Sequence, residues 1–314
     1  MEFRLYPLTD ESRLQEICDL FAQGLGETTV AYWKWKHFTE NGLPQSIMIV
    51  AEDNTGKIVG MYALQPMWYC NSKERVLVSL GEDLVVDKTF RGTGLVKRLR
   101  QYGDNFYIDQ RADFWAGYAN PISFIIFQKY GAKNCGDIYS YQSQKTILPP
   151  LFPKTNYTHD GWEISVCDRM PSDLFFQTGD TSFRMEKNAS FMEWKFEKNP
   201  NQKFKWLTIR NNGVLKGYMV FHVNRGRFRK AVNIHDWDLM SDVSDQVLKR
   251  AVDILRSMGN WVSLWGRYDD AVLARWKMAG IGEKSTQGTH FLLCPYGVKE
   301  LPDQWHLTRA DLDF

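Results

Sequence analysis

The pattern of apolar and polar positions divides the chain into short strands and amphipathic helices. Apolar runs bounded by turn residues predict buried strands, and apolar positions three or four apart predict helices. In the first half this pattern predicts helices over 10–22, 31–38 and 121–130 and strands over 46–51, 57–64, 75–86 and 114–120. The turn Asn54-Thr55-Gly56 joins two of these strands into a hairpin, and Asp10 is the expected cap of the first helix.

The second half repeats this order of elements. It predicts strands over 205–210, 214–223, 231–239 and 261–266 and a helix over 242–258. Short matches also recur in the same order: 32–38 resembles 191–197, 56–60 resembles 213–217, and 127–131 resembles 276–280. We interpret the chain as a duplicated unit of about half its length.

A proline-rich stretch over 145–154 separates the halves and is typical of a linker. The sequence therefore predicts a first domain over 1–148, a linker over 149–160 and a second domain over 161–314.

One strand–loop–helix segment has residues that are typical of an anion-binding site. The strand ending at Val86 runs into a loop with Arg91, Gly92 and Gly94, and a basic helix follows. Glycine lets backbone N–H groups approach a ligand, and the start of a helix attracts anions. The spacing fits neither a P-loop nor a dinucleotide fingerprint. The segment predicts a pyrophosphate site, and an ordinary strand–helix turn is the alternative.

The run Arg91-Gly92-Thr93-Gly94-Leu95-Val96 resembles the Arg/Gln-x-x-Gly-x-Gly/Ala signature of the GNAT superfamily of acyl-CoA-dependent N-acyltransferases, with Val96 in place of Gly or Ala. The resemblance implies an α/β (α+β) fold. It would consist of two tandem GNAT-like domains, each a mixed, mostly antiparallel twisted sheet flanked by helices. It also implies that Arg91 and the backbone of Gly92, Thr93, Gly94, Leu95 and Val96 bind the pyrophosphate of coenzyme A.

The same resemblance assigns further cofactor contacts. Free backbone groups near Leu84, Val85 and Val86 would hold the pantetheine arm and polarise the thioester carbonyl, as an oxyanion hole does. Asn120 matches a position that contacts the cofactor arm, or else caps the helix after it. Phe127 occupies the position where the family has a thiolate-protonating tyrosine.

Three residues are candidates for proton transfer. Glu82 or Asp83, on the strand beside the reaction centre, would act as the base if burial raises its pKa. The alternatives are that one of the two faces solvent, or that water takes the proton without a dedicated base. Tyr118 has the phenol nearest in sequence to position 127, where Phe127 replaces the family's thiolate-protonating tyrosine. It would protonate the thiolate, or else it is a packing residue.

The corresponding loop of the second half differs. Residues 239–245 contain no glycine and two aspartates, and an aspartate at a helix start competes with an anion. We therefore expect the second domain to be a degenerate copy without the pyrophosphate site.

Composition excludes several classes of function. The net charge of +2 and the absence of a basic recognition helix argue against nucleic-acid binding. No apolar run approaches the roughly 18–20 residues of a membrane span, and the N-terminus lacks a signal peptide. The five cysteines, odd in number and without C-x-x-C spacing, favour the cytoplasm, and the isolated histidines support no metal site.

The expected function is transfer of an acyl group from acyl-CoA to the amine of a small acceptor. The paired Trp-Lys segments and the tail 305–313 are loosely similar to a subset that acylates nucleotide-linked amino sugars for bacterial surface glycans. An antibiotic amine or a peptide is the alternative acceptor. A non-catalytic CoA-binding module is the other alternative, and Phe127 is its best support.

Overall fold

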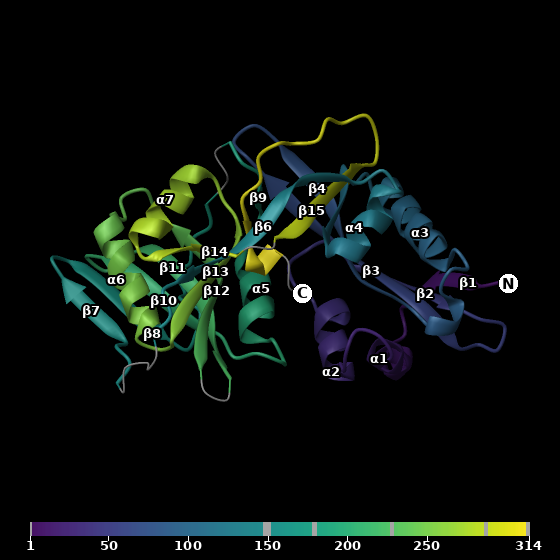
Figure 1. Ribbon diagram of the computed structural model, residues 1–314, viewed down its shortest axis with the longest axis horizontal. Helices are drawn as coiled ribbons and strands as arrows, with labels where there is room; N and C mark the ends of the chain where they lie inside the picture. Colours follow the sequence, from purple (N-terminus) through teal and green to yellow (C-terminus); the bar gives the residue numbers. More distant parts are fainter. Residues whose placement is uncertain (1, 147–151, 178–180, 227–228, 286–287, 312–314) are drawn as a thin grey trace. The chain divides into compact units, whose positions relative to one another are not determined.

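The computed structural model in Figure 1 describes residues 1–314 except 1, 147–151, 178–180, 227–228, 286–287 and 312–314. The chain folds into two compact units. Unit 1 comprises Met1–Gly136, Asn199–Asn201 and His290–Asp303, and unit 2 comprises Asp137–Lys198, Gln202–Thr289 and Gln304–Phe314.

A mixed sheet forms the centre of unit 1. Its strands, in spatial order, are β1 (Arg4–Pro7), β2 (Ile47–Glu52), β3 (Ile58–Cys70), β4 (Arg75–Val86), β5 (Phe114–Ala119) and β15 (Thr289–Pro295). Only β4 and β5 run parallel, and the other neighbours are antiparallel. The expected α/β class, with a mostly antiparallel sheet flanked by helices, is confirmed.

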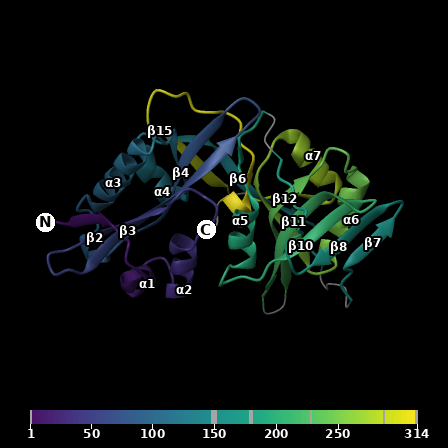
Figure 2. The same ribbon diagram turned by 180° about the vertical axis from the view of Figure 1, so that it is seen from behind.

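Helices cover both faces of this sheet because its central strands are apolar on both sides (Figures 1 and 2). In β2, Ile47, Ile49 and Ala51 pack in one core cluster with α3 (Leu95–Asp109), whereas Met48 and Val50 pack in a second cluster with α1 (Leu14–Ala22). The side chains of a strand point alternately to its two faces, which explains this division.

The remaining helical segments of unit 1 are short. A 3₁₀ turn (Glu11–Arg13) precedes α1, with the Asp10 side chain as the expected cap. The others are α2 (Val30–Trp33), a π-helical turn (Lys34–Phe38), a 3₁₀ turn (Lys88–Phe90) and α4 (Pro121–Gln128).

Glycine at position 81 allows close packing inside unit 1. The indole N–H of Trp115 donates a hydrogen bond of 2.7 Å to the hydroxyl of Tyr62. A Cβ added at Gly81 would lie 2.2 Å from that hydroxyl and 2.6 Å from that nitrogen. A larger residue at position 81 would therefore disrupt this pair.

Unit 2 is built on the same plan. Its strands, in spatial order, are β7 (Asn156–His159), β8 (Trp162–Cys167), β10 (Lys205–Asn211), β11 (Val214–Arg225), β12 (Lys230–Leu239), β13 (Trp261–Arg267) and β6 (Lys133–Ser143). Again one neighbouring pair, β12 and β13, runs parallel. Its helices α6 (Asp245–Arg256) and α7 (Asp270–Met278) are visible in Figure 2 beside these strands.

The smaller elements of unit 2 complete the chain. They are β9 (Arg184–Met185), α5 (Ala189–Met192), a π-helical turn (Glu193–Glu197), β14 (Ile281–Lys284), β16 (Leu307–Thr308) and a 3₁₀ turn (Arg309–Asp311). Helix α6 begins later than expected because Ser244, and not Asp242, accepts the hydrogen bond of the first turn.

The two halves share an unusual local structure. In each, one turn of α-helix (α2 or α5) continues into a five-residue π-helical turn, and the turn carries a buried lysine, Lys36 or Lys195. The sequence match between 32–38 and 191–197 therefore corresponds to matching backbone structure.

The compact units do not follow the linear division expected at residues 148 and 161. Strand β6 precedes this division but pairs with β13 and β14 of unit 2, and β15 comes from the last part of the chain but pairs with β5 of unit 1. Within the expected linker over 149–160, residues 156–159 form β7, and 149–151 lie outside the described residues.

Among the described helices, none combines the length and apolarity that crossing a bilayer requires.

Candidate functional site

The candidate site in unit 1 lies where two parallel strands separate. β4 and β5 pair only from Val78 with Phe114 to Gly81 with Gly117. The register of β4 against β3 then shifts at a bulge, and Asp83 in this bulge has a φ of 46°. Bulges bend a strand and increase its twist. Beyond Gly81 the end of β4 therefore diverges from β5.

Hydrogen bonding decides which backbone groups of β4 face this divergence. Val85 pairs with Met61, and the Asp87 amide donates to the Val59 carbonyl at 2.9 Å. Because alternate residues of an antiparallel strand bond to the same neighbour, the amide of Val86 points away from β3, whereas Leu84 lies in the bulge itself. Val85 is paired with Met61 in the β3–β4 ladder, and its expected contact with the pantetheine arm stays a prediction.

The loop after β4 has the backbone of an anion cradle. Gly92 and Gly94 have φ of 78° and 81°, which side-chain-bearing residues rarely adopt. Residues 91–94 are exposed, and α3 starts at Leu95, directly after Gly94, without a side-chain cap. The first N–H groups of α3 are therefore available to an anion.

The side chains around this loop have separate roles. Arg91 Nε donates to the Val86 carbonyl at 3.4 Å, and the Thr93 hydroxyl donates to the Phe90 carbonyl at 2.7 Å. Leu95 is buried and Val96 half-buried, and both pack in the core from the first turn of α3. Only their backbone groups would face a pyrophosphate.

Both candidate carboxylates converge on one buried lysine. Lys36, with a side chain only 3% exposed, lies 3.0 Å from Glu82 Oε2 and forms a second ion pair with Asp83. Simple strand alternation would send one of the two carboxylates to solvent. The bulge at Asp83 breaks that alternation and brings both carboxylates to Lys36.

The expected raised pKa of Asp83 is wrong. Burial by itself would raise that pKa, but the Lys36 ammonium outweighs burial and lowers it to about 2. Burial lowers the pKa of His37, whose ring is stacked on Trp33 and whose Nε2 lies 3.9 Å from Asp83. At neutral pH the cluster thus holds ionised Asp83 beside a charged lysine and a neutral imidazole.

The other expected site residues lie on β5 and α4. Tyr118 is half-buried on β5, with its ring stacked on Phe291 at 5.4 Å. The Asn120 side chain accepts the amide hydrogen of Ser123 at 3.0 Å, so it caps α4. Phe127 is 9% exposed and packs on Trp115 at 4.9 Å, which makes it a core residue.

Neither Lys36 nor His37 was predicted from the sequence to belong to the site. The available signal was the repeated pair Trp35-Lys36 and Trp194-Lys195, which marks equivalent buried lysines in the two units. The partners of Lys36 are 46 and 47 positions away in the sequence, and only the bulged strand brings them together.

The equivalent loop of unit 2 is organised differently. The Ser244 side chain caps α6 by accepting the Val247 amide hydrogen at 3.3 Å. Asp242 pairs with Lys216 at 2.6 Å and Asp245 with Arg275 at 2.9 Å. Here the start of the helix has its own acceptor and two nearby carboxylates, which disfavour an anion.

No group of three or more His, Cys, Asp and Glu side chains that could hold a metal occurs among the residues that the structure describes.

Comparison with known proteins identifies the fold of this site. Residues 14–139 match the model of the Acetyltransferase (GNAT) family. No curated protein matches the chain in sequence.

Several solved structures share the fold over nearly the whole chain. A GCN5-related N-acetyltransferase from Anabaena variabilis is 15% identical with a TM-score of 0.67, over 95% of this chain and 74% of that one. A probable N-acyltransferase from Enterococcus faecalis is 10% identical with a TM-score of 0.66, over 94% and 73%. A tandem GNAT protein from the clavulanic acid biosynthesis pathway is 12% identical with a TM-score of 0.61, over 95% and 100%.

The family match covers β2 to β5, the Gly92–Gly94 loop and α3, which are the elements that build the candidate site. Residues 14–139 are therefore similar in sequence to the Acetyltransferase (GNAT) family, and the chain shares the fold of the solved GNAT structures.

Proposed function

We propose that unit 1 transfers an acyl group from acyl-CoA to the amine of a small acceptor at the β4–β5 divergence. The observation that carries this proposal is the loop with Gly92 and Gly94 in left-handed conformation, followed by the uncapped start of α3. This loop lies directly after the strand that carries the bulge at Asp83 and whose Val86 lies between two residues paired with β3.

The residues of the loop and of β4 would have distinct roles. Arg91 and the backbone of residues 92–96 bind the pyrophosphate, and the amides of Leu84 and Val86 hold the pantetheine arm and polarise the thioester carbonyl. The amine lone pair attacks the carbonyl carbon, a C–N bond forms, and the C–S bond breaks. Alignment of the two reactants supplies much of the rate.

The cluster of Lys36, Glu82 and Asp83 would position the amine without taking its proton. Because Lys36 keeps Asp83 ionised, Asp83 is a weak base, and its role with Glu82 would be to orient the amine through its N–H groups. Water then removes the amine proton. Tyr118 remains the proposed donor to the departing thiolate.

We further propose a nucleotide-linked amino sugar as the acceptor, for surface glycan synthesis, and the cytoplasm as the location. Support comes from the loose similarity of residues 305–313 and of the two Trp-Lys segments. The rings of Trp33, Trp35 and Trp194 are all buried, so they do not serve as a stacking platform for the nucleotide base.

Calorimetric titration with CoA tests the first step. We expect one site per chain, and we expect Gly94→Glu to abolish it. Gly56→Glu is the matched control, because Gly56 also has a positive φ of 85° and open space around its Cβ position but lies in the β2–β3 turn. Absence of binding by the native protein, or equal loss in both variants, would contradict the proposal.

Release of the CoA thiol from acetyl-CoA then tests the acceptor. The panel contains nucleotide-linked amino sugars, free amino sugars, an aminoglycoside and a peptide with a free N-terminus. Turnover restricted to the nucleotide-linked sugars supports the proposed acceptor, and turnover with the aminoglycoside or the peptide replaces it. Tight CoA binding without turnover of any amine identifies a non-catalytic module.

A further inference from the structure

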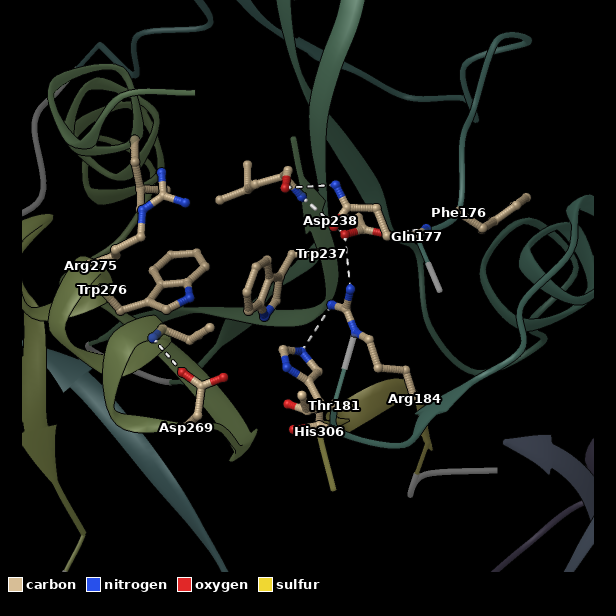
Figure 3. Close-up of a pocket in the computed structure, with 14 residues that line it drawn as sticks. Phe176, Gln177, Thr181, Arg184, Trp237, Asp238, Asp269, Arg275, Trp276 and His306 are labelled. Carbon is tan, nitrogen blue, oxygen red and sulfur yellow. Dashed lines mark hydrogen bonds and ion pairs between the residues drawn. The ribbon is translucent and has the colours of Figure 1, made fainter. Parts of the chain in front are cut away.

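Unit 2 contains a cavity that the proposed reaction does not use (Figure 3). Its volume is about 520 Å³, within the range of small-molecule pockets, and every lining residue belongs to unit 2. The end of β12, at Trp237–Leu239, lines it beyond the last pair of β12 with β13, Ile234 with Leu264. Because the start of α6 is capped and flanked by carboxylates, this space does not suit a pyrophosphate.

A small recess adjoins this cavity. The two spaces share five lining residues, namely Phe176, Gln177, Arg184, Asp238 and His306. The recess has a volume of about 10 Å³, which is room for about one water molecule or one hydroxyl group. Lys187 and Asp311 line the recess but not the larger cavity. A group that fills the recess must therefore suit an ammonium and a carboxylate at once.

One oxygen of Asp311 lacks a donor. The residue is 1% exposed, and its Oδ2 accepts the Thr308 amide hydrogen at 2.5 Å. Its Oδ1 is buried and has no hydrogen-bond partner among the residues that the structure describes. Burial raises the pKa of this carboxyl, and the Lys187 ammonium lowers it. Because a buried polar atom without a partner is costly, Asp311 Oδ1 indicates an occupant of the recess that donates a hydrogen bond.

Lys187 supplies the complementary donor. Its Nζ lies 2.5 Å from Asp236 Oδ1 and 3.5 Å from the Thr308 hydroxyl oxygen. An ammonium group has three donors, and these are its hydrogen bonds within the described part of the chain. Asp236 also accepts hydrogen bonds from the hydroxyls of Tyr218 and Thr308, at 3.2 and 3.0 Å. Asp236 is thus satisfied inside the cluster, and the third donor of Lys187 is left for an acceptor in the recess.

The wall shared by the two spaces is fixed by its own contacts. Figure 3 shows Arg184 linked to both Asp238 and His306, at 3.4 and 3.1 Å. Because a guanidinium only donates, His306 Nε2 accepts and the ring is neutral. Asp238 also accepts the Gln177 amide hydrogen at 2.9 Å. The arginine and the aspartate match each other, so this wall offers ordered hydrogen-bonding groups without a net charge.

The larger cavity adds both polar and apolar groups. Thr181 and Ser182 contribute hydroxyls, and Leu239, Leu248 and Val272 contribute aliphatic side chains. A sugar ring has hydroxyls around its edge and C–H groups on its faces, so a lining of this mixed kind suits it. The volume of the cavity is sufficient for a molecule of that size.

We propose that this cavity binds a neutral polyol of monosaccharide size, with one hydroxyl in the recess. That hydroxyl donates to Asp311 Oδ1 and accepts from Lys187 Nζ, because a hydroxyl is both donor and acceptor at one atom. An ammonium group in the recess would face Lys187, and a carboxylate would face Asp311, so both are disfavoured there. The inference depends on contacts within unit 2 and is independent of acyl transfer in unit 1.

Saturation-transfer NMR titrations with D-glucose, D-galactose and D-mannose test this inference. We expect saturable binding of at least one of these hexoses. Asp311→Asn should weaken it about tenfold, because a hydrogen bond to an ionised group is lost. The asparagine oxygen can still accept the Thr308 amide hydrogen, which leaves its NH₂ group in place of the acceptor Oδ1. The variant should therefore keep its melting temperature.

Asp242→Asn is the matched control, because Asp242 is a paired carboxylate of unit 2 that lines neither space. It should leave the affinity unchanged. Ser182→Trp, in the wall of the larger cavity but not of the recess, should abolish binding. The inference fails if no hexose binds, if Asp311→Asn binds as well as Asp242→Asn does, or if Ser182→Trp still binds. Binding of cationic D-glucosamine alone would also overturn it, by assigning the recess to an ammonium group.

Discussion

Replacing Lys36 by methionine tests whether the buried ion cluster supports unit 1. The side chains of Glu82 and Asp83 are 8% and 21% exposed, so the variant leaves two carboxylates largely buried without their cation. Loss of one partner from a buried ion pair costs about 3–5 kcal/mol. We expect a cost of about 3 kcal/mol, because Asp83 keeps some contact with water.

Urea unfolding at pH 7 measures this cost, and hydrogen exchange of peptides over 75–90 shows whether the loss is local to β4. Lys34→Met is the matched control. Lys34 lies in the same π-helical turn, but its ion pair with Glu11 has side chains that are 51% and 44% exposed. Such a surface pair contributes about 0–1 kcal/mol. Lys36→Arg keeps the charge and should recover part of the loss.

The pH dependence of this difference has a defined sign. In the native protein the pKa of Asp83 is lowered to about 2, so its contribution to stability is present near neutrality and is lost as the pH falls below its unfolded value. Without Lys36, burial raises that pKa in the folded state. The variant therefore gains relative stability on acidification, and the difference between the two proteins narrows. Equal costs for Lys36→Met and Lys34→Met, or a gap that widens in acid, would refute this reasoning.

Three further substitutions have defined outcomes. Gly81→Ala places a Cβ 2.2 Å from the Tyr62 hydroxyl and should cost about 1–3 kcal/mol by overpacking, measured by urea unfolding. Ser244→Ala removes the cap of α6 and should cost about 1 kcal/mol, and Ser244→Asp should restore it. Asp83→Asn should lower kcat and leave CoA affinity unchanged, because asparagine tolerates the positive φ of this residue but loses the charge that orients the amine. Loss of CoA binding in this variant would instead assign Asp83 a structural role at the loop.

The fold could be predicted to the extent that it depends on local sequence. The repeated order of elements, the turn at Gly56 and the left-handed residues Gly92 and Gly94 are each determined by nearby residues, and the sequence shows them directly. The exchange of β6 and β15 could not be predicted in this way. Which strand pairs with β5 is decided by contacts between residues more than 150 positions apart, such as Ala119 and His290.

The parts of the candidate site that depend on local sequence were also predictable, and the parts that depend on long-range contacts were not. The loop from Arg91 to Val96 is a contiguous motif, whereas Lys36 reaches Glu82 and Asp83 only through the bulge in β4. Alternation along an ideal strand predicts instead that the side chains of Glu82 and Asp83 point to opposite faces of the sheet. The cavity of unit 2 has no motif, because its walls come from segments spread between residues 176 and 306.

The place of β15 in unit 1 has a consequence for how the protein is made. The ribosome releases residues 14–139 first, but the edge of β5 stays without its antiparallel neighbour until residues 289–295 have been synthesised. An exposed strand edge is a template for pairing with other chains. The β5 edge therefore stays unpaired for the time needed to translate nearly all of the second half. A message truncated after residue 148 would encode a chain with an unprotected β5 edge, prone to aggregation, despite carrying the whole loop from Arg91 to Val96.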